Sequence, residues 1–135
     1  MPFDFQAELD PPSPPPWRIM EVGAAVASAF ADSDLRVALV ASSSWSHAFM
    51  IDKTWRLQPD VDADREVYGA LQAGDYDIWR KRTLDEIESS GRQELLNWYA
   101  LAGAMERLGR TAPTWSTMIE THVFNSPKVF AVYEP

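Results

Sequence analysis

The sequence predicts an α/β fold in which a partial, mostly parallel sheet is flanked by helices. Two runs, Val37–Ala41 and Val129–Tyr133, are apolar at every position, as in strands that are buried on both faces. Apolar residues before and between these runs recur at three- and four-residue spacing, which is typical of amphipathic helices. The 135 residues are enough for one domain. We therefore expect an extended Pro-rich segment at 1–16 and a single α/β domain at 17–135.

The N-terminal elements follow from proline and from apolar spacing. Six prolines among the first 16 residues exclude regular helix and sheet ladders. Ser13 and Pro14 then resemble a helix N-cap and first turn. The helix that follows should end near Ala31, because one face carries regularly spaced small and apolar residues: Ile19, Val22, Gly23, Val26 and Phe30.

Beyond the Val37–Ala41 strand, a Ser-rich turn leads to His47, and we expect a long loop from Ala48 to Val61. Helices are predicted at Asp62–Ala73, from Asp75 to about Ile87, and after a capping box at Ser90–Gln93. Gly74 and Gly109 should end the first and third of these. A short helix around Trp115–Glu120 is expected before the last strand. The alternating Asp60, Asp62 and Asp64 are interpreted as a solvated helix start.

Composition excludes several classes of function. Twenty acidic against 12 basic residues give a net charge of -8, which repels nucleic acid and anionic membranes, so we expect neither as a partner. Without cysteine there can be no disulfide, thiolate metal site or Cys nucleophile. No signal-peptide pattern and no apolar run of the roughly 20 residues that span a bilayer is visible. A cytoplasmic location is expected.

Few residues offer catalytic chemistry. Of the two histidines, His47 follows a predicted buried strand, and ligands of open α/β sheets bind at the carboxyl ends of strands. Glu94 lies in the first turn of a predicted helix, where it either complements the helix dipole or points into a site facing His47. His122, near Glu120, is interpreted as a packed or surface residue. Motifs for zinc, calcium and phosphate binding are absent, as is the nucleophile constellation of a hydrolase.

Three segments together resemble one family: Ser42–His47, Gln93–Trp98 and Gly103–Glu106. They are similar to the C-terminal half of the class III extradiol ring-cleavage dioxygenases, the superfamily of the protocatechuate 4,5-dioxygenase catalytic subunit. Further similarity lies in Asp10–Pro14, Asp52–Leu57 and Val123–Ser126, so the resemblance runs from about Leu9 to the C-terminus. It implies the fold of that half of the catalytic domain.

The resemblance also implies a function, namely the opening of catechol-type rings with O₂ at non-haem Fe(II). His47 matches the acid/base of the family, which stands next to the metal, and Glu94 matches the carboxylate ligand of the iron. The two iron-binding histidines of the family lie in its N-terminal half, and His122 matches neither of them. Because one carboxylate cannot hold Fe(II) alone, iron is expected only when a second chain or the missing half supplies two histidines.

A different class of function remains open. Two buried-type strands leave unpaired edges, so the chain should form a homo- or hetero-oligomer. The alternative to the enzyme is therefore a non-catalytic α/β interaction module that oligomerises through sheet edges. Iron content after reconstitution distinguishes the two.

Overall fold

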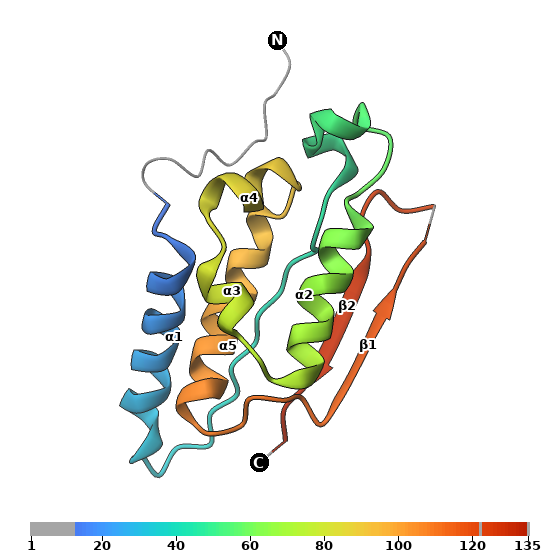
Figure 1. Ribbon diagram of the computed structural model, residues 1–135. Coiled ribbons are helices and arrows are strands. Elements are labelled where there is room, and N and C mark those ends of the chain that lie inside the picture. Colours follow the sequence, from blue (N-terminus) through green and yellow to red (C-terminus); the bar gives the residue numbers. More distant parts are fainter. Residues whose placement is uncertain (1–12, 122, 135) are drawn as a thin grey trace.

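The computed structural model describes residues 13–121 and 123–134, so the expected extended segment at 1–16 lies mostly outside the described residues. The described chain forms an α/β arrangement in which helices pack on one small sheet (Figure 1). The helices and strands are α1 (Pro16–Ala31), α2 (Val61–Ala73), α3 (Asp77–Lys81), α4 (Leu84–Ser89), α5 (Leu96–Arg107), β1 (Trp115–Ile119) and β2 (Lys128–Val132). Three 3₁₀ turns are also present: η1 (Ala48–Met50), η2 (Asp52–Thr54) and η3 (Gln93–Leu95).

Helices α1 and α5 lie against each other so closely that their backbones touch (Figure 1). A Cβ on Gly103 would lie 2.0 Å from the carbonyl oxygen of Met20, and one on Gly23 would lie 1.8 Å from that of Ala100. Glycine is therefore required at both positions. The expected helix ending at Ala31 is confirmed, but the expected N-cap at Ser13 is wrong: the helix begins at Pro16, and its N-cap is Pro15, which caps it with no side-chain hydrogen bond.

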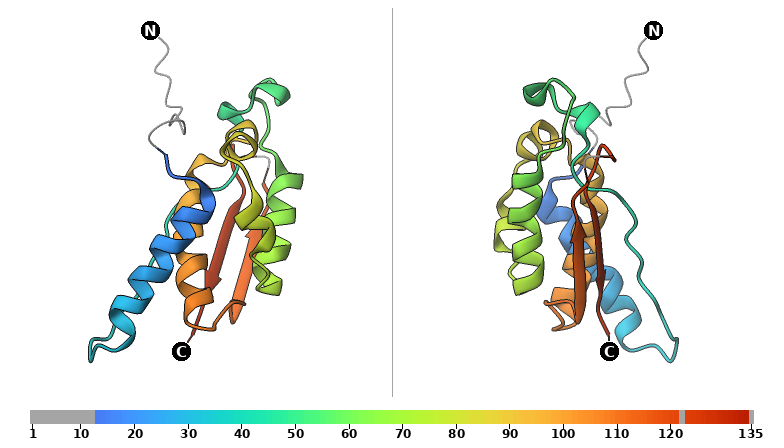
Figure 2. Two further views of the ribbon diagram at one scale, coloured as in Figure 1. Left: turned by 60° about the vertical axis from the view of Figure 1, so that its left-hand side comes forward. Right: turned by 90° about the vertical axis from the view of Figure 1, so that its right-hand side faces the viewer.

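Strands β1 and β2 form an antiparallel pair, in which Trp115 lies opposite Val132 and Met118 opposite Val129. Figure 2 shows this pair beside α2 and α5, and the inward-facing side chains of both strands join the core. The expected short helix at Trp115–Glu120 is wrong, because this segment is β1. A partner strand nine residues later in the chain decides its conformation, and the five-residue pattern alone does not reveal that partner.

The expected strand at Val37–Ala41 is also wrong. The segment is extended, but it makes no backbone hydrogen bond to any other described residue and residues 37–40 are exposed. Val40 exposes 80% of its surface. Figure 2 shows the chain in this region standing apart from the two strands. The sheet of the described residues is consequently antiparallel and two-stranded, rather than mostly parallel, since a strand exists only where a neighbour accepts its hydrogen bonds.

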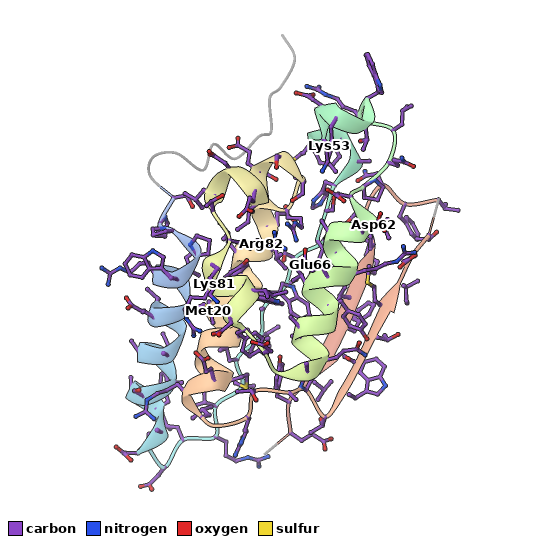
Figure 3. The ribbon with its side chains drawn as sticks, viewed as in Figure 1. Met20, Lys53, Asp62, Glu66, Lys81 and Arg82 are labelled. Carbon is purple, nitrogen blue, oxygen red and sulfur yellow. The ribbon has the colours of Figure 1, made fainter. Side chains whose placement is uncertain are left out.

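The single helix expected after Asp75 is broken into α3 and α4. Arg82 is extended and Thr83 begins α4 with a capping box to Glu86. The capping box expected at Ser90–Gln93 is also wrong. The hydroxyl of Ser90 does not cap the following turn but donates back to the carbonyls of Glu86 and Ile87. The break directs Arg82 towards α2, where it pairs with Glu66 (Figure 3).

The core is centred on the indole ring of Trp45, which is fully buried. Trp79 and Trp98 approach this ring edge-on, with centroids at 6.2 and 5.4 Å. These contacts anchor the chain immediately before Ser46 and His47. None of the helices within residues 13–121 and 123–134 is both long and apolar enough to cross a membrane.

Candidate functional site

Three consecutive backbone N–H groups hold His47 and its neighbours in place. The N–H of Ser46 donates to the Asp64 carboxylate at 3.1 and 3.3 Å. The N–H of His47 donates to the carbonyl of Gly91 at 2.9 Å, and that of Ala48 to Asn125 at 2.8 Å. The three acceptors come from α2, from the turn before η3 and from the turn before β2. These three bonds hold the Ser46–Ala48 backbone in place without any pairing to a neighbouring strand.

The side chain of Ser46 adds two further bonds to this framework. Its hydroxyl donates to the carbonyl of Ser90 at 2.7 Å and accepts from the N–H of Asp60 at 2.8 Å. Asp60 is the N-cap of α2, and its carboxylate accepts from the N–H of Ala63. Although burial opposes ionisation, the hydrogen bonds from Lys53 and from Ala63 hold the pKa of Asp60 below its ordinary value.

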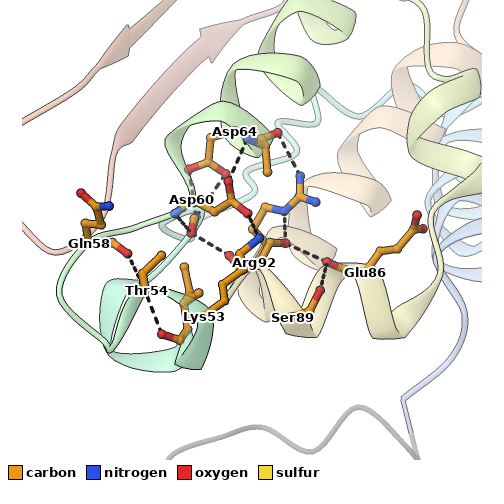
Figure 4. Close-up of polar contacts among 12 residues, drawn as sticks. Lys53, Thr54, Gln58, Asp60, Asp64, Glu86, Ser89 and Arg92 are labelled. Atoms are coloured by element: carbon orange, nitrogen blue, oxygen red, sulfur yellow. Dashed lines mark hydrogen bonds and ion pairs between the residues drawn. The ribbon is translucent and has the colours of Figure 1, made fainter.

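Asp64 and Arg92 bring charge into this buried region (Figure 4). Burial raises the pKa of Asp64 to about 7, against the opposing effects of the Ser46 N–H and the nearby Arg92 guanidinium. Arg92 is itself buried, and it donates to the Ser90 hydroxyl at 2.6 Å and to the carbonyl of Ala63 at 3.1 Å. The network thus connects α2, the Ser46–His47 segment and the turn that leads to Glu94.

His47 and Glu94 lie together at the edge of this network. The Nε2 atom of His47 is 3.7 Å from Oε2 of Glu94, too far for a hydrogen bond but within the range of an ion pair. The His47 side chain is 11% exposed and that of Glu94 is 55% exposed. Glu94 lies in η3, one turn before α5, and not in the first turn of the long helix as expected. The pair therefore consists of a buried imidazole whose Nε2 faces a carboxylate open to solvent.

The orientation of the imidazole is further constrained by Phe49. The two rings lie edge to face with centroids 5.3 Å apart. The Nδ1 atom of His47 is buried and has no hydrogen-bond partner among the described residues. Of the two ring nitrogens, Nε2 is therefore the one placed to contact a group bound beside Glu94.

The donor set can be tested against the needs of a metal ion. Among the described residues no three His, Cys, Asp or Glu side chains are grouped so that they could hold one. Glu94 offers one accessible carboxylate, and a 2-His-1-carboxylate set that binds non-haem Fe(II) needs one such oxygen ligand. His122 lies outside the described residues. Glu94 thus fits the role of a single ligand, and two further donors are needed.

Sequence interpretation missed the residues that support this pair. Asp64 was expected in a solvated helix start, but its side chain is fully buried. The spacing of Asp64 from Val67 and Leu71, three and seven residues later on one helical face, could have suggested that Asp64 faces inward. Gly91 and Arg92 carried no distinctive signal, because their roles depend on contacts with residues about 45 and 30 positions away.

Comparison with known proteins gave one finding. The family model described as the catalytic LigB subunit of aromatic ring-opening dioxygenase matches residues 8–132, which is most of the chain. The comparison with curated proteins gave no match, and neither did the comparison with solved structures.

Proposed function

The chain belongs to the family of the catalytic LigB subunit of aromatic ring-opening dioxygenases, and on that premise we propose that it is part of a non-haem Fe(II) extradiol dioxygenase. Its substrates would be a catechol-type aromatic compound and O₂. The observation that best supports this proposal is the 3.7 Å approach of His47 Nε2 to Glu94 Oε2. It puts the proposed proton carrier beside the proposed metal ligand.

Each residue of the pair has a distinct role in this proposal. Glu94 supplies the carboxylate ligand, and its exposure leaves room for donors from another segment. Bound Fe(II) would supply Lewis-acid activation of the diol and a binding position for O₂. His47 accepts the proton of a substrate hydroxyl at Nε2 and later returns it, while its burial keeps bulk water from competing for that proton.

The proposal requires a second polypeptide segment that carries two histidine ligands. The exposed apolar surface of the described residues supports such a partner. A groove of about 690 Å³ lies between the unpaired Val37–Ala41 segment, α1, α5 and the end of β2, and it is lined by Val26, Phe30, Leu101, Met105 and Val132 among others. Large exposed apolar surfaces commonly mark protein interfaces. In the complete assembly the partner would cover this surface, and Val37–Ala41 would join a larger, mostly parallel sheet. The proposed location of the assembly is the cytoplasm.

The unpaired segment also favours a second candidate function. A non-catalytic α/β module that assembles through Val37–Ala41 and the free edge of β2 would explain the same exposed surface. Such a module would have no need for the His47–Glu94 pair, which would then be coincidental.

Reconstitution of the assembly distinguishes the two candidates. The chain is mixed, without oxygen, with a polypeptide that carries the two-histidine half of a family member, and Fe(II) is added. We expect about one bound iron per complex and opening of a catechol-type acid once O₂ is admitted. An assembly that forms but neither binds iron nor opens the ring would support the module and contradict the enzyme.

A further inference from the structure

We propose that Asp64 is a positioning residue, which accepts the backbone N–H of Ser46 and thereby holds His47 with its imidazole turned towards Glu94. The proposal rests on the proposed function of the His47–Glu94 pair. It concerns only how this chain orients His47, so it can be tested without iron, substrate or a partner.

The geometry of the bond ties Asp64 directly to the backbone that carries His47. Asp64 and Ser46 are both fully buried, and the two carboxylate oxygens share one N–H at 3.1 and 3.3 Å. Ser46 immediately precedes His47. A rotation of the peptide unit that carries the Ser46 N–H would turn the next residue as well, because neighbouring units share only two soft dihedral angles. A fixed Ser46 N–H therefore limits the directions that the His47 side chain can take.

A side-chain acceptor is needed at this point because no backbone acceptor is available. Residues 35–45 make no backbone–backbone hydrogen bond to other described residues, whereas the N–H groups of His47 and Ala48 each have a carbonyl partner. Without Asp64, the buried Ser46 N–H would be unsatisfied, a costly arrangement that the chain would relieve by moving. That movement would displace His47 from its place beside Phe49 and Glu94.

A carboxylate is a demanding choice for this task. Burial disfavours its ionised form, and the charged groups that face it are Arg92 from the turn before η3 and Asp60 from its own helix. An apolar side chain of similar size would avoid this desolvation. What the carboxylate adds is an acceptor with a fixed direction, held on the buried face of the helix that carries it.

The test compares variants of the full chain by NMR at neutral to slightly alkaline pH. Asp64→Asn keeps a side-chain oxygen but loses the charge, whereas Asp64→Leu has a similar volume and no acceptor. Asp62→Asn is the matched control, since its carboxylate lies on the same helix and is 91% exposed. Amide exchange at Ser46 and His47 reports the local hydrogen bonds, and ring-proton shifts and nuclear Overhauser contacts between His47 and Phe49 report the imidazole.

In Asp64→Leu we expect exchange at Ser46 and His47 to accelerate at least about tenfold beyond what the change in global stability explains, with loss of the His47–Phe49 contact. Asp64→Asn should restore most of both signals, and Asp62→Asn should match the unaltered chain. If Asp64→Leu changes only global stability and leaves the imidazole signals native, the proposal is overturned. It is equally overturned if Asp64→Asn restores nothing relative to Asp64→Leu.

Should Asp64→Leu fail to fold, Asp64→Asn alone still provides the test. Its Ser46 amide proton should move upfield more than any amide does in Asp62→Asn, because a charge-assisted bond becomes a neutral one. An unmoved Ser46 signal would overturn the proposal. The outcome is independent of the reconstitution experiment, in which a loss of iron or activity contradicts the proposed function and leaves the role of Asp64 in orienting His47 standing.

Discussion

The backbone N–H of His47 donates to the carbonyl of Gly91 at 2.9 Å and so joins the two segments that carry the candidate site. Gly91 has a φ of 63°, in the left-handed region that favours glycine. A Cβ at this position would lie 2.7 Å from the carbonyl oxygen of His47 and 2.8 Å from Cγ1 of Ile51. The close approach of the two segments therefore depends on the absence of a side chain at residue 91.

Gly91→Ala should lower the free energy of unfolding by about 2–4 kcal/mol, because left-handed strain and a steric clash act together. Gly109→Ala is the matched control, since Gly109 has a φ of 70° but nothing within 4 Å of a new Cβ. It should lose only about 1 kcal/mol, the cost of the backbone conformation. Urea denaturation measures both variants, and equal losses would show that the contact with His47 is loose.

Gly103→Ala should destabilise the protein by about 3 kcal/mol or more, because α1 and α5 must move apart to admit the methyl group. Gly69→Ala in α2 is the control, since nothing lies within 4 Å of a Cβ there. Alanine favours helix over glycine, so this control should gain up to about 1 kcal/mol. Thermal unfolding followed by circular dichroism reports both changes, and a Gly103→Ala variant as stable as the original chain would contradict the backbone contact.

Glu94→Ala and His47→Ala should fail in different ways in the reconstituted assembly. Without its carboxylate ligand, Glu94→Ala should lose bound iron and activity together. His47→Ala should keep the iron and lose about 10²- to 10⁴-fold in turnover, as expected when a proton carrier is removed. Metal analysis and ring-opening assays separate the two, with Asp85→Ala, an exposed carboxylate in α4, as control. Iron and activity retained in Glu94→Ala would refute the assigned role.

The stability of the chain should depend on pH through Asp64. Burial raises its pKa in the folded state to about 7, above the value near 4 in an unfolded chain, so the native state binds more protons between these values. The contribution of Asp64 to the free energy of unfolding is therefore greatest below about pH 4. This contribution falls by about 2–4 kcal/mol as the pH rises to about 7. Urea denaturation between about pH 5 and pH 8 should show this decline in the original chain and lack it in Asp64→Asn. Parallel pH profiles would contradict the raised pKa.

The isolated chain should associate through its uncovered apolar segment. Sedimentation at micromolar concentration is expected to show a dimer or larger species. Val40→Lys should weaken this association at least about tenfold, since it puts a charge in the exposed edge. Leu57→Lys is the control, because Leu57 is equally exposed at 82% but lies in the loop after η2. A stable monomer in the unaltered chain would refute the expectation.

The sequence by itself determined the elements whose signals are local. Apolar spacing and proline located α1, and Gly74 marked the end of α2 in a left-handed cap. The family resemblance could also be recognised from the sequence, because His47 and Glu94 belong to short, contiguous patterns. Such features depend on neighbours within a few positions, so the sequence pattern alone can predict them.

Only the tertiary structure decided the features that depend on distant partners. Val37–Ala41 has the composition of a buried strand, yet no described strand accepts its hydrogen bonds, whereas Trp115–Ile119 becomes a strand because β2 pairs with it. Asp64 resembles a solvated helix residue in the sequence and lies fully buried beneath Ser46. Strand pairing and the burial of a charge are properties of contacts between segments far apart in the chain, so local pattern cannot specify them.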